Sequence, residues 1–141
     1  MPTLDQKKAV LRILGDLIRH DKIEVSDQDY SYFVYLGSKI LKLSENDMLD
    51  AQSQRFLFNW QALISDLDPT HYLAFKQLMV AILTQGGKRM PSSSEKTAFE
   101  KYFSILPNPK GLPSTFDAIK NEVRNDMGNF MGDSNLLYPW I

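Results

Sequence analysis

The chain has 141 residues, of which 43% are hydrophobic and 23% charged, a composition typical of one folded soluble domain rather than a disordered chain. Its 16 basic and 17 acidic residues nearly cancel, so no global field favours binding to nucleic acid. The lack of cysteine excludes disulfides, thiolate metal sites and cysteine nucleophiles. We therefore expect a cytoplasmic helical domain, residues 1–128, with no leader and no transmembrane segment, and an apolar C-terminal tail, residues 129–141.

The first predicted helix begins near the start of the chain. Thr3 and Gln6 have the spacing of a capping box, and apolar residues follow at positions 10, 13, 14, 17 and 18, which is the spacing of a buried helical stripe. Basic residues such as Lys8 and Arg12 share this helix with acidic ones. The mixed charges predict that this side of the helix faces solvent.

Serine caps predict the next two helices. Ser26 is followed three residues later by Asp29, an acid near the positive end of a helix dipole. The apolar stripe of that helix includes Gly37, where the lack of a side chain would let a neighbouring backbone approach closely. Ser44, with Asp47 three residues later, opens the third helix.

A fourth stretch leads to a strong helix start. The segment 48–67 keeps helical apolar spacing but is polar at residues 52–55, so one bent helix and two short helices both stay open. Asp68 followed by Pro69 then marks the start of a helix, and the glycine pair 86–87 predicts its end. Its apolar stripe is Phe75, Leu78, Met79, Ile82 and Leu83.

The last two predicted helices are separated by a proline-rich loop. Ser92 and Glu95 cap the first of them, whose apolar face is Phe99, Tyr102, Phe103 and Leu106. Residues 107–113 contain three prolines, which excludes helix, and Ser114 or Thr115 caps a final helix that carries Phe116, Ile119 and Val123. No segment has the alternating pattern of a strand. The fold class is therefore all-α, a single-domain bundle of about six helices.

One pattern occurs twice in the chain: a serine, an acid three residues later and a phenylalanine four residues after that. The first copy is Ser26, Asp29 and Phe33, and the second is Ser92, Glu95 and Phe99. The offset between the copies is constant. It predicts two related helix–loop–helix units, because such a unit cannot bury its apolar stripe alone.

Four carboxylates cluster before and at the start of the second helix: Asp21, Glu24, Asp27 and Asp29. Clustered oxygen ligands suit a hard cation, so this loop is a candidate site for Ca²⁺ or Mg²⁺. The alternative is that Asp27 and Asp29 complement the positive end of the helix dipole and Glu24 is solvated. No other cofactor is expected.

A catalytic alternative depends on His71. No recognisable partner for His71 lies near it in the sequence, so a small helical hydrolase would need a carboxylate that the fold brings close. The sequence has no Gly-x-Ser-x-Gly motif, and no phosphate-binding loop follows the glycine pair 86–87.

The C-terminal tail is strongly apolar. Its last six residues contain five large apolar side chains: Leu136, Leu137, Tyr138, Trp140 and Ile141. Such a segment either docks on its own domain or binds a protein partner, because it would be an aggregation liability if it were left exposed.

The first helix–loop–helix unit resembles the TerB-like family of tellurite-resistance proteins. The resemblance covers residues 10–49, where an apolar helix is followed by an acidic loop, a serine and an acid that opens the next helix, and it extends loosely over residues 75–106. It implies an all-helical fold with the unit repeated and, through the family's acidic loops, a divalent-metal role for Asp21 and Asp29.

The leading functional prediction is a non-enzymatic helical interaction or adaptor module that acts through an apolar groove or tail. The TerB-like resemblance implies a setting in a bacterial stress-response or defence system. A divalent-cation-binding regulatory domain that uses the acidic loop 21–29 is the alternative, and a small helical hydrolase is the second alternative.

Overall fold

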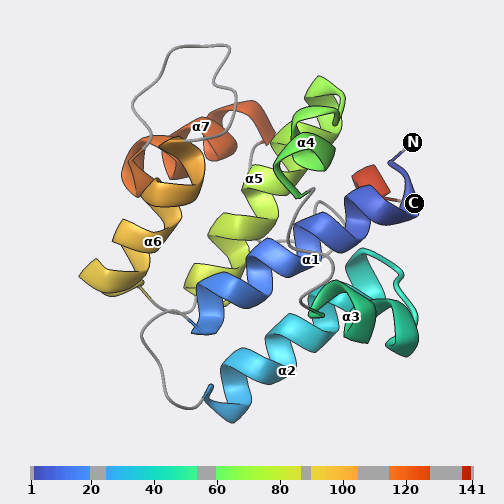
Figure 1. The fold of residues 1–141 in the computed structure, drawn as a ribbon. Coiled ribbons are helices and arrows are strands. Elements are labelled where there is room, and N and C mark those ends of the chain that lie inside the picture. The colour runs from blue at the N-terminus through green and yellow to red at the C-terminus, as the bar shows by residue number, and fades with distance from the viewer. Residues whose placement is uncertain are drawn as a thin grey trace.

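The computed structural model describes residues 2–19, 25–53, 60–86, 90–104, 115–127 and 138–140, and for residues 122–127 and 138 it describes the backbone alone. All regular structure in these ranges is helical: seven α-helices, one π-helical segment and one short 3-10 helix. The all-α prediction is therefore confirmed. Figure 1 shows α1 in the middle of the bundle, with α5 beside it.

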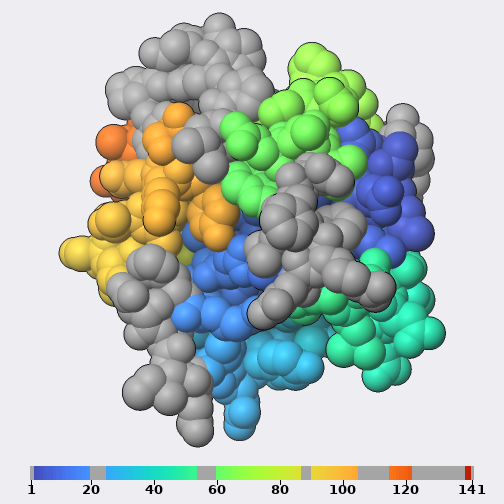
Figure 2. Space-filling view, viewed as in Figure 1, coloured from blue at the N-terminus to red at the C-terminus, as the bar shows by residue number. Residues whose placement is uncertain are grey.

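Helix α1 (Leu4–Arg19) is the central element of the fold. The predicted capping box is present, because the amide of Thr3 donates to Oε1 of Gln6 over 2.8 Å and the amide of Gln6 donates to Oγ1 of Thr3 over 3.1 Å. The helix contacts α2, α3, α4, α5 and α6. On the face shown in Figure 2 it reaches the surface as a band between α2 and α4.

Because neighbouring helices cover α1 on several sides, the prediction of a solvent-facing polar side is wrong for Arg12. This side chain is buried, and its Nη1 donates to the carbonyl of Ser53 over 3.0 Å. Lys8 is partly buried and forms an ion pair with Asp50 of α3 at 2.8 Å. Amphipathic spacing identified the apolar residues, but it could not show that α1 has no wholly free side.

Helix α2 (Asp27–Tyr35) begins at the predicted cap, where Ser26 Oγ accepts from the amide of Asp29 over 3.1 Å. It continues into the π-helical segment η1 (Leu36–Ile40). The predicted stripe is buried throughout: Phe33, Leu36, Gly37, Ile40 and Leu41. A Cβ at Gly37 would lie 2.6 Å from Sδ of Met48 and 3.1 Å from Cδ1 of Leu11, so side chains rather than a backbone approach this glycine.

The segment 48–67 contains two separate helices in its described residues. Helix α3 (Glu45–Ala51) starts at Ser44, whose Oγ accepts from the amide of Asp47 over 3.1 Å. Helix α4 (Trp60–Ser65) packs on α1. The two-helix alternative is therefore the one observed, and residues 54–59 lie outside the described residues.

Helix α5 (Pro69–Thr84) starts as predicted, with Asp68 at the N-cap and Pro69 in the first turn. Its end differs slightly from the prediction. Gln85 already adopts a left-handed conformation with φ of 49°, followed by Gly86 at 70°, while Gly87 lies outside the described residues. Positive φ is costly for a side-chain-bearing residue, and Gln85 Nε2 donates to Oδ1 of Asp29 on α2, a bond that helps to hold this conformation.

Helices α6 (Ser93–Ser104) and α7 (Phe116–Met127) close the bundle through an aromatic cluster. The ring centroid of Phe99 lies 4.7 Å from that of Phe103 and 5.2 Å from that of Phe116. Thr115, one of the two predicted caps, accepts from the amide of Ala118 over 3.2 Å. Leu106, the proline-rich loop and Ser114 lie outside the described residues, as does the side chain of Val123.

The two copies of the Ser-acid-Phe pattern have closely similar local geometry. Ser92 Oγ accepts from the amide of Glu95 over 3.2 Å, and Glu95 Oε1 accepts from the amide of Ser92 over 3.0 Å. As in the first copy, the serine caps a helix and the acid is buried, with Asp29 at 5% and Glu95 at 4% exposure. Phe33 and Phe99 both belong to the main core. Both serines therefore cap a helix, and the relation between the two units stays a prediction.

Candidate functional site

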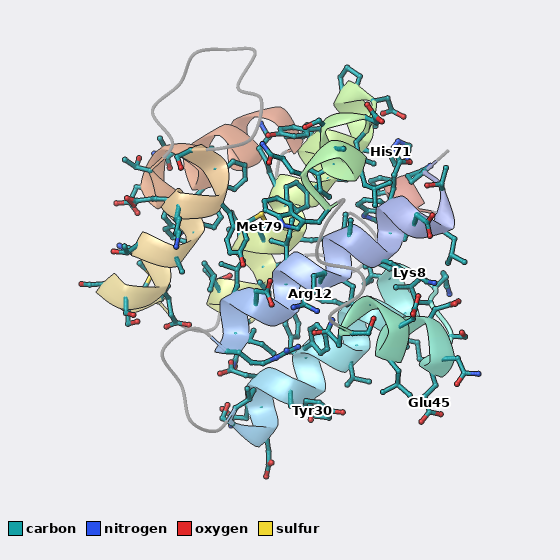
Figure 3. The ribbon with its side chains drawn as sticks, in the orientation of Figure 1. Lys8, Arg12, Tyr30, Glu45, His71 and Met79 are labelled. Carbon is teal, nitrogen blue, oxygen red and sulfur yellow. The ribbon has the colours of Figure 1, made fainter. Side chains whose placement is uncertain are left out.

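The C-terminal segment lies on α5. The short helix η3 (Tyr138–Trp140) contacts α5, and Figure 3 shows His71 of α5 beside it. Trp140 is 1% exposed, and its ring centroid lies 5.5 Å from that of His71 with the planes at 62°. Among the predicted partner-binding residues, Trp140 therefore docks on its own domain. Leu136, Leu137 and Ile141 lie outside the described residues, as does the side chain of Tyr138.

A short polar bridge links α5 to this segment. Asp68 caps α5 through Oδ1, which accepts from the amide of His71 over 2.9 Å. Its second oxygen, Oδ2, lies 2.7 Å from Nδ1 of His71, and Nε2 of the same ring lies 2.6 Å from the carbonyl oxygen of Pro139. The imidazole is thus held between a carboxylate on its own helix turn and a backbone carbonyl of η3.

The bridge has a clear electrostatic consequence for Asp68. Hydrogen bonds from the backbone amide and then from the ring of His71 lower the pKa of the Asp68 carboxyl from its ordinary value. The carboxylate is therefore ionised and accepts hydrogen bonds at neutral pH. Both ring nitrogens of His71 face acceptors, Nδ1 the carboxylate of Asp68 and Nε2 the carbonyl of Pro139.

The docked Trp140 carries one unsatisfied group. Its indole Nε1 is buried and has no hydrogen-bond partner in the described part of the chain. A buried donor without an acceptor costs about 1–3 kcal/mol. The aromatic surface of Trp140 is therefore buried, whereas its indole N–H has no acceptor among the described residues.

The described half of the predicted cation site does not converge. Asp27 is exposed in the first turn of α2, whereas Asp29 is buried and accepts from Gln85 Nε2. Residues two apart on a helix point to different sides, so these two carboxylates do not face one ion. Asp21 and Glu24 lie outside the described residues, and the described residues hold no cluster of three or more metal-ligating side chains.

A second polar cluster, which is partly buried, joins α1 to α6. Arg12 Nε lies 3.4 Å from Oδ1 of Asp16, and the Tyr102 hydroxyl donates to Oδ2 of Asp16 over 3.0 Å. Burial, then the charge of Asp16, raises the pKa of the Tyr102 hydroxyl well above its ordinary value. The cluster ties two helices together, and Trp60 covers it by packing against Tyr102 at 5.5 Å between centroids.

The sequence contained a signal for the partner of His71 that was not recognised: the partner is Asp68. Asp68 lies three residues before His71 at a helix start, and that spacing places both side chains on one side of the helix. The carboxylate is therefore local and was not brought close by the wider fold. The place where Trp140 docks had no such signal, because it depends on contacts between distant parts of the chain.

Comparisons with known proteins do not assign this site. No family model, no curated protein and no solved structure matches the chain. The helices in the described ranges are each too short or too polar to cross a membrane. The class that the fold itself defines is an all-helical bundle with a docked C-terminal segment.

Proposed function

We propose that this protein is a non-enzymatic helical interaction module whose partner-binding element is the C-terminal segment, residues 136–141. The observation that carries the proposal is the docked but incompletely satisfied state of Trp140. The segment is strongly apolar, and its described part, η3, lies on α5.

A partner could compete with α5 for the segment, because docking leaves the indole N–H of Trp140 without an acceptor among the described residues. A partner groove that offers an acceptor to the indole N–H of Trp140 would recover the roughly 1–3 kcal/mol that the buried donor costs in the docked state. The segment would bring several apolar side chains to such a groove, and buried tryptophan is among the commonest hot-spot residues at interfaces. The expected partner is therefore a protein with an apolar groove lined by at least one backbone or side-chain acceptor.

The alternatives have less support. A hydrolase would need an acid–base group that reaches a substrate, and in the docked state Nε2 of His71 faces the carbonyl oxygen of Pro139 instead. A cation site would need converging oxygens, and Asp27 and Asp29 diverge on α2. An adaptor role in a bacterial stress-response or defence system, as the TerB-like resemblance implies, is compatible with a docked segment that a partner can capture.

Site-specific photocrosslinking tests the proposal. A photoreactive amino acid replaces Leu137 in one variant and Asn46, an exposed residue of α3, in a matched control. A captured protein is then purified and added to the Trp60→Phe variant, in which Trp140 is the sole tryptophan. We expect capture through position 137 alone and a change in Trp140 emission when the partner binds. Equal capture at both positions, or unchanged emission, would contradict the proposal.

A further inference from the structure

We propose that protonation of His71 is the switch that holds η3 of the C-terminal segment on α5: η3 docks when the imidazole carries both protons and is released when the imidazole loses one. Such a switch would regulate when the segment is available to a partner, and this part of the inference rests on the proposed function. The docking equilibrium itself can be measured without any partner.

The geometry around the ring requires two donors. Nδ1 lies 2.7 Å from a carboxylate oxygen of Asp68, and Nε2 lies 2.6 Å from the carbonyl oxygen of Pro139. A backbone carbonyl only accepts, and so does an ionised carboxylate. A neutral imidazole has one N–H, whereas the imidazolium has two. Only the charged ring donates to both oxygens at these distances.

The groups that face the ring favour the same conclusion. On the α5 side the charged neighbour is Asp68, whose pKa is lowered, so it stays ionised throughout the range in which histidine changes charge, about pH 5 to 8. The chain's amino group adds a smaller coulombic effect on Asp68. On the η3 side the described groups are the carbonyl of Pro139 and the indole of Trp140, neither of which titrates in this range.

Loss of one proton to solvent weakens the contact with the segment. The remaining proton stays on Nδ1, where it faces the negative charge of Asp68. The lone pair on Nε2 then faces the carbonyl oxygen of Pro139 across a contact that measures 2.6 Å in the docked state. Two lone pairs repel at that distance, so the hydrogen bond between His71 and η3 is replaced by a repulsion. Raising the pH therefore favours the released segment.

Asp68→Asn separates this switch from a merely structural role. Asparagine is as good an N-cap as aspartate, so α5 keeps its start. Its amide group can donate to a deprotonated Nδ1, which leaves the proton of the neutral ring on Nε2 to donate to Pro139. The neutral imidazole then satisfies both contacts, and docking no longer needs the charge.

The test follows the emission of Trp140 in the Trp60→Phe background from pH 5.5 to 8. A second readout, the indole N–H chemical shift of Trp140 in the unaltered chain, guards against damage from the Trp60 substitution. We expect a red shift of the emission as the pH rises, unchanged in the matched control His20→Gln and absent in His71→Gln and Asp68→Asn. A pH-independent Trp140, a transition that persists in His71→Gln, or a wild-type profile in Asp68→Asn would overturn the switch. Because no partner is present, any of these results leaves the crosslinking test of the proposed function standing.

Discussion

Two buried glycines of the core differ in what a methyl group would meet. At Gly15 of α1 an added Cβ would lie 2.6 Å from Oε1 of Gln52 and 2.7 Å from Nη2 of Arg19, both at the ends of flexible side chains. At Gly37 it would meet Met48 and the fully buried Leu11. Flexible ends can move at little cost, whereas a packed leucine cannot.

The two glycine-to-alanine substitutions should therefore have different effects. We expect Gly15→Ala to be neutral or slightly stabilising, because alanine favours a helix by about 0.5–1 kcal/mol and offsets the small displacement. Gly37→Ala should lower the free energy of unfolding by about 1–3 kcal/mol through overpacking. Urea denaturation of both variants measures the difference. Equal stabilities would show that the core around Gly37 is looser than the structure indicates.

Asp68 should also make folding stability depend on acid pH. The pKa of Asp68 is lowered in the folded state from its ordinary value of 3.8. Its ionised carboxylate therefore adds to the free energy of unfolding above pH 3.8, and this stabilisation is lost as the pH falls through the lower pKa of the folded state. An asparagine at this position does not ionise and makes no such contribution. We expect the free energy of unfolding of wild type and Asp68→Asn to converge as the pH falls below 3.8, as followed by urea titrations at several pH values. If the difference in free energy of unfolding between the two proteins did not change with pH, the hydrogen bonds from His71 to Asp68 could not be the source of the difference.

At the level of elements, local signals predicted most of the helix starts. Thr3, Ser26, Ser44, Asp68 and Ser92 were assigned from the sequence as caps or parts of capping boxes, and each accepts the expected amide hydrogen bond. A cap acts within one turn, so its pattern is fully visible in the sequence. The burial of Arg12 was not visible in the sequence, because it results from helices in distant parts of the chain that pack on α1.

The start of α2 yields a prediction about cations. Because Asp27 is exposed and Asp29 is engaged by Gln85, we expect millimolar Ca²⁺ or Mg²⁺ to leave the melting temperature unchanged. A ligand at 100 times its dissociation constant would instead add about 2.7 kcal/mol of stability. Differential scanning fluorimetry with and without the ions decides between these outcomes. A rise that disappears in Asp21→Ala would restore the acidic loop as a cation site.

For the whole molecule, the all-α class was predictable and the docking of the segment was not. Helical spacing and the absence of strand patterns gave the class directly. The apolar composition of residues 136–141 showed that the segment must be covered, but composition does not say by what. The structure supplies that answer for Trp140, which lies against α5 beside His71.

The difference in stability between the full chain and a chain that ends at residue 135 tests the central claim most directly. Removal of residues 136–141 deletes Trp140, and losing a buried tryptophan costs about 3 kcal/mol or more where the segment is docked. We expect a loss of this size at pH 5.5 and a much smaller loss at pH 8, both measured by urea denaturation. An equal loss at both pH values would make the segment a permanent part of the core, and no loss at either would show that it does not dock; either result would contradict the account.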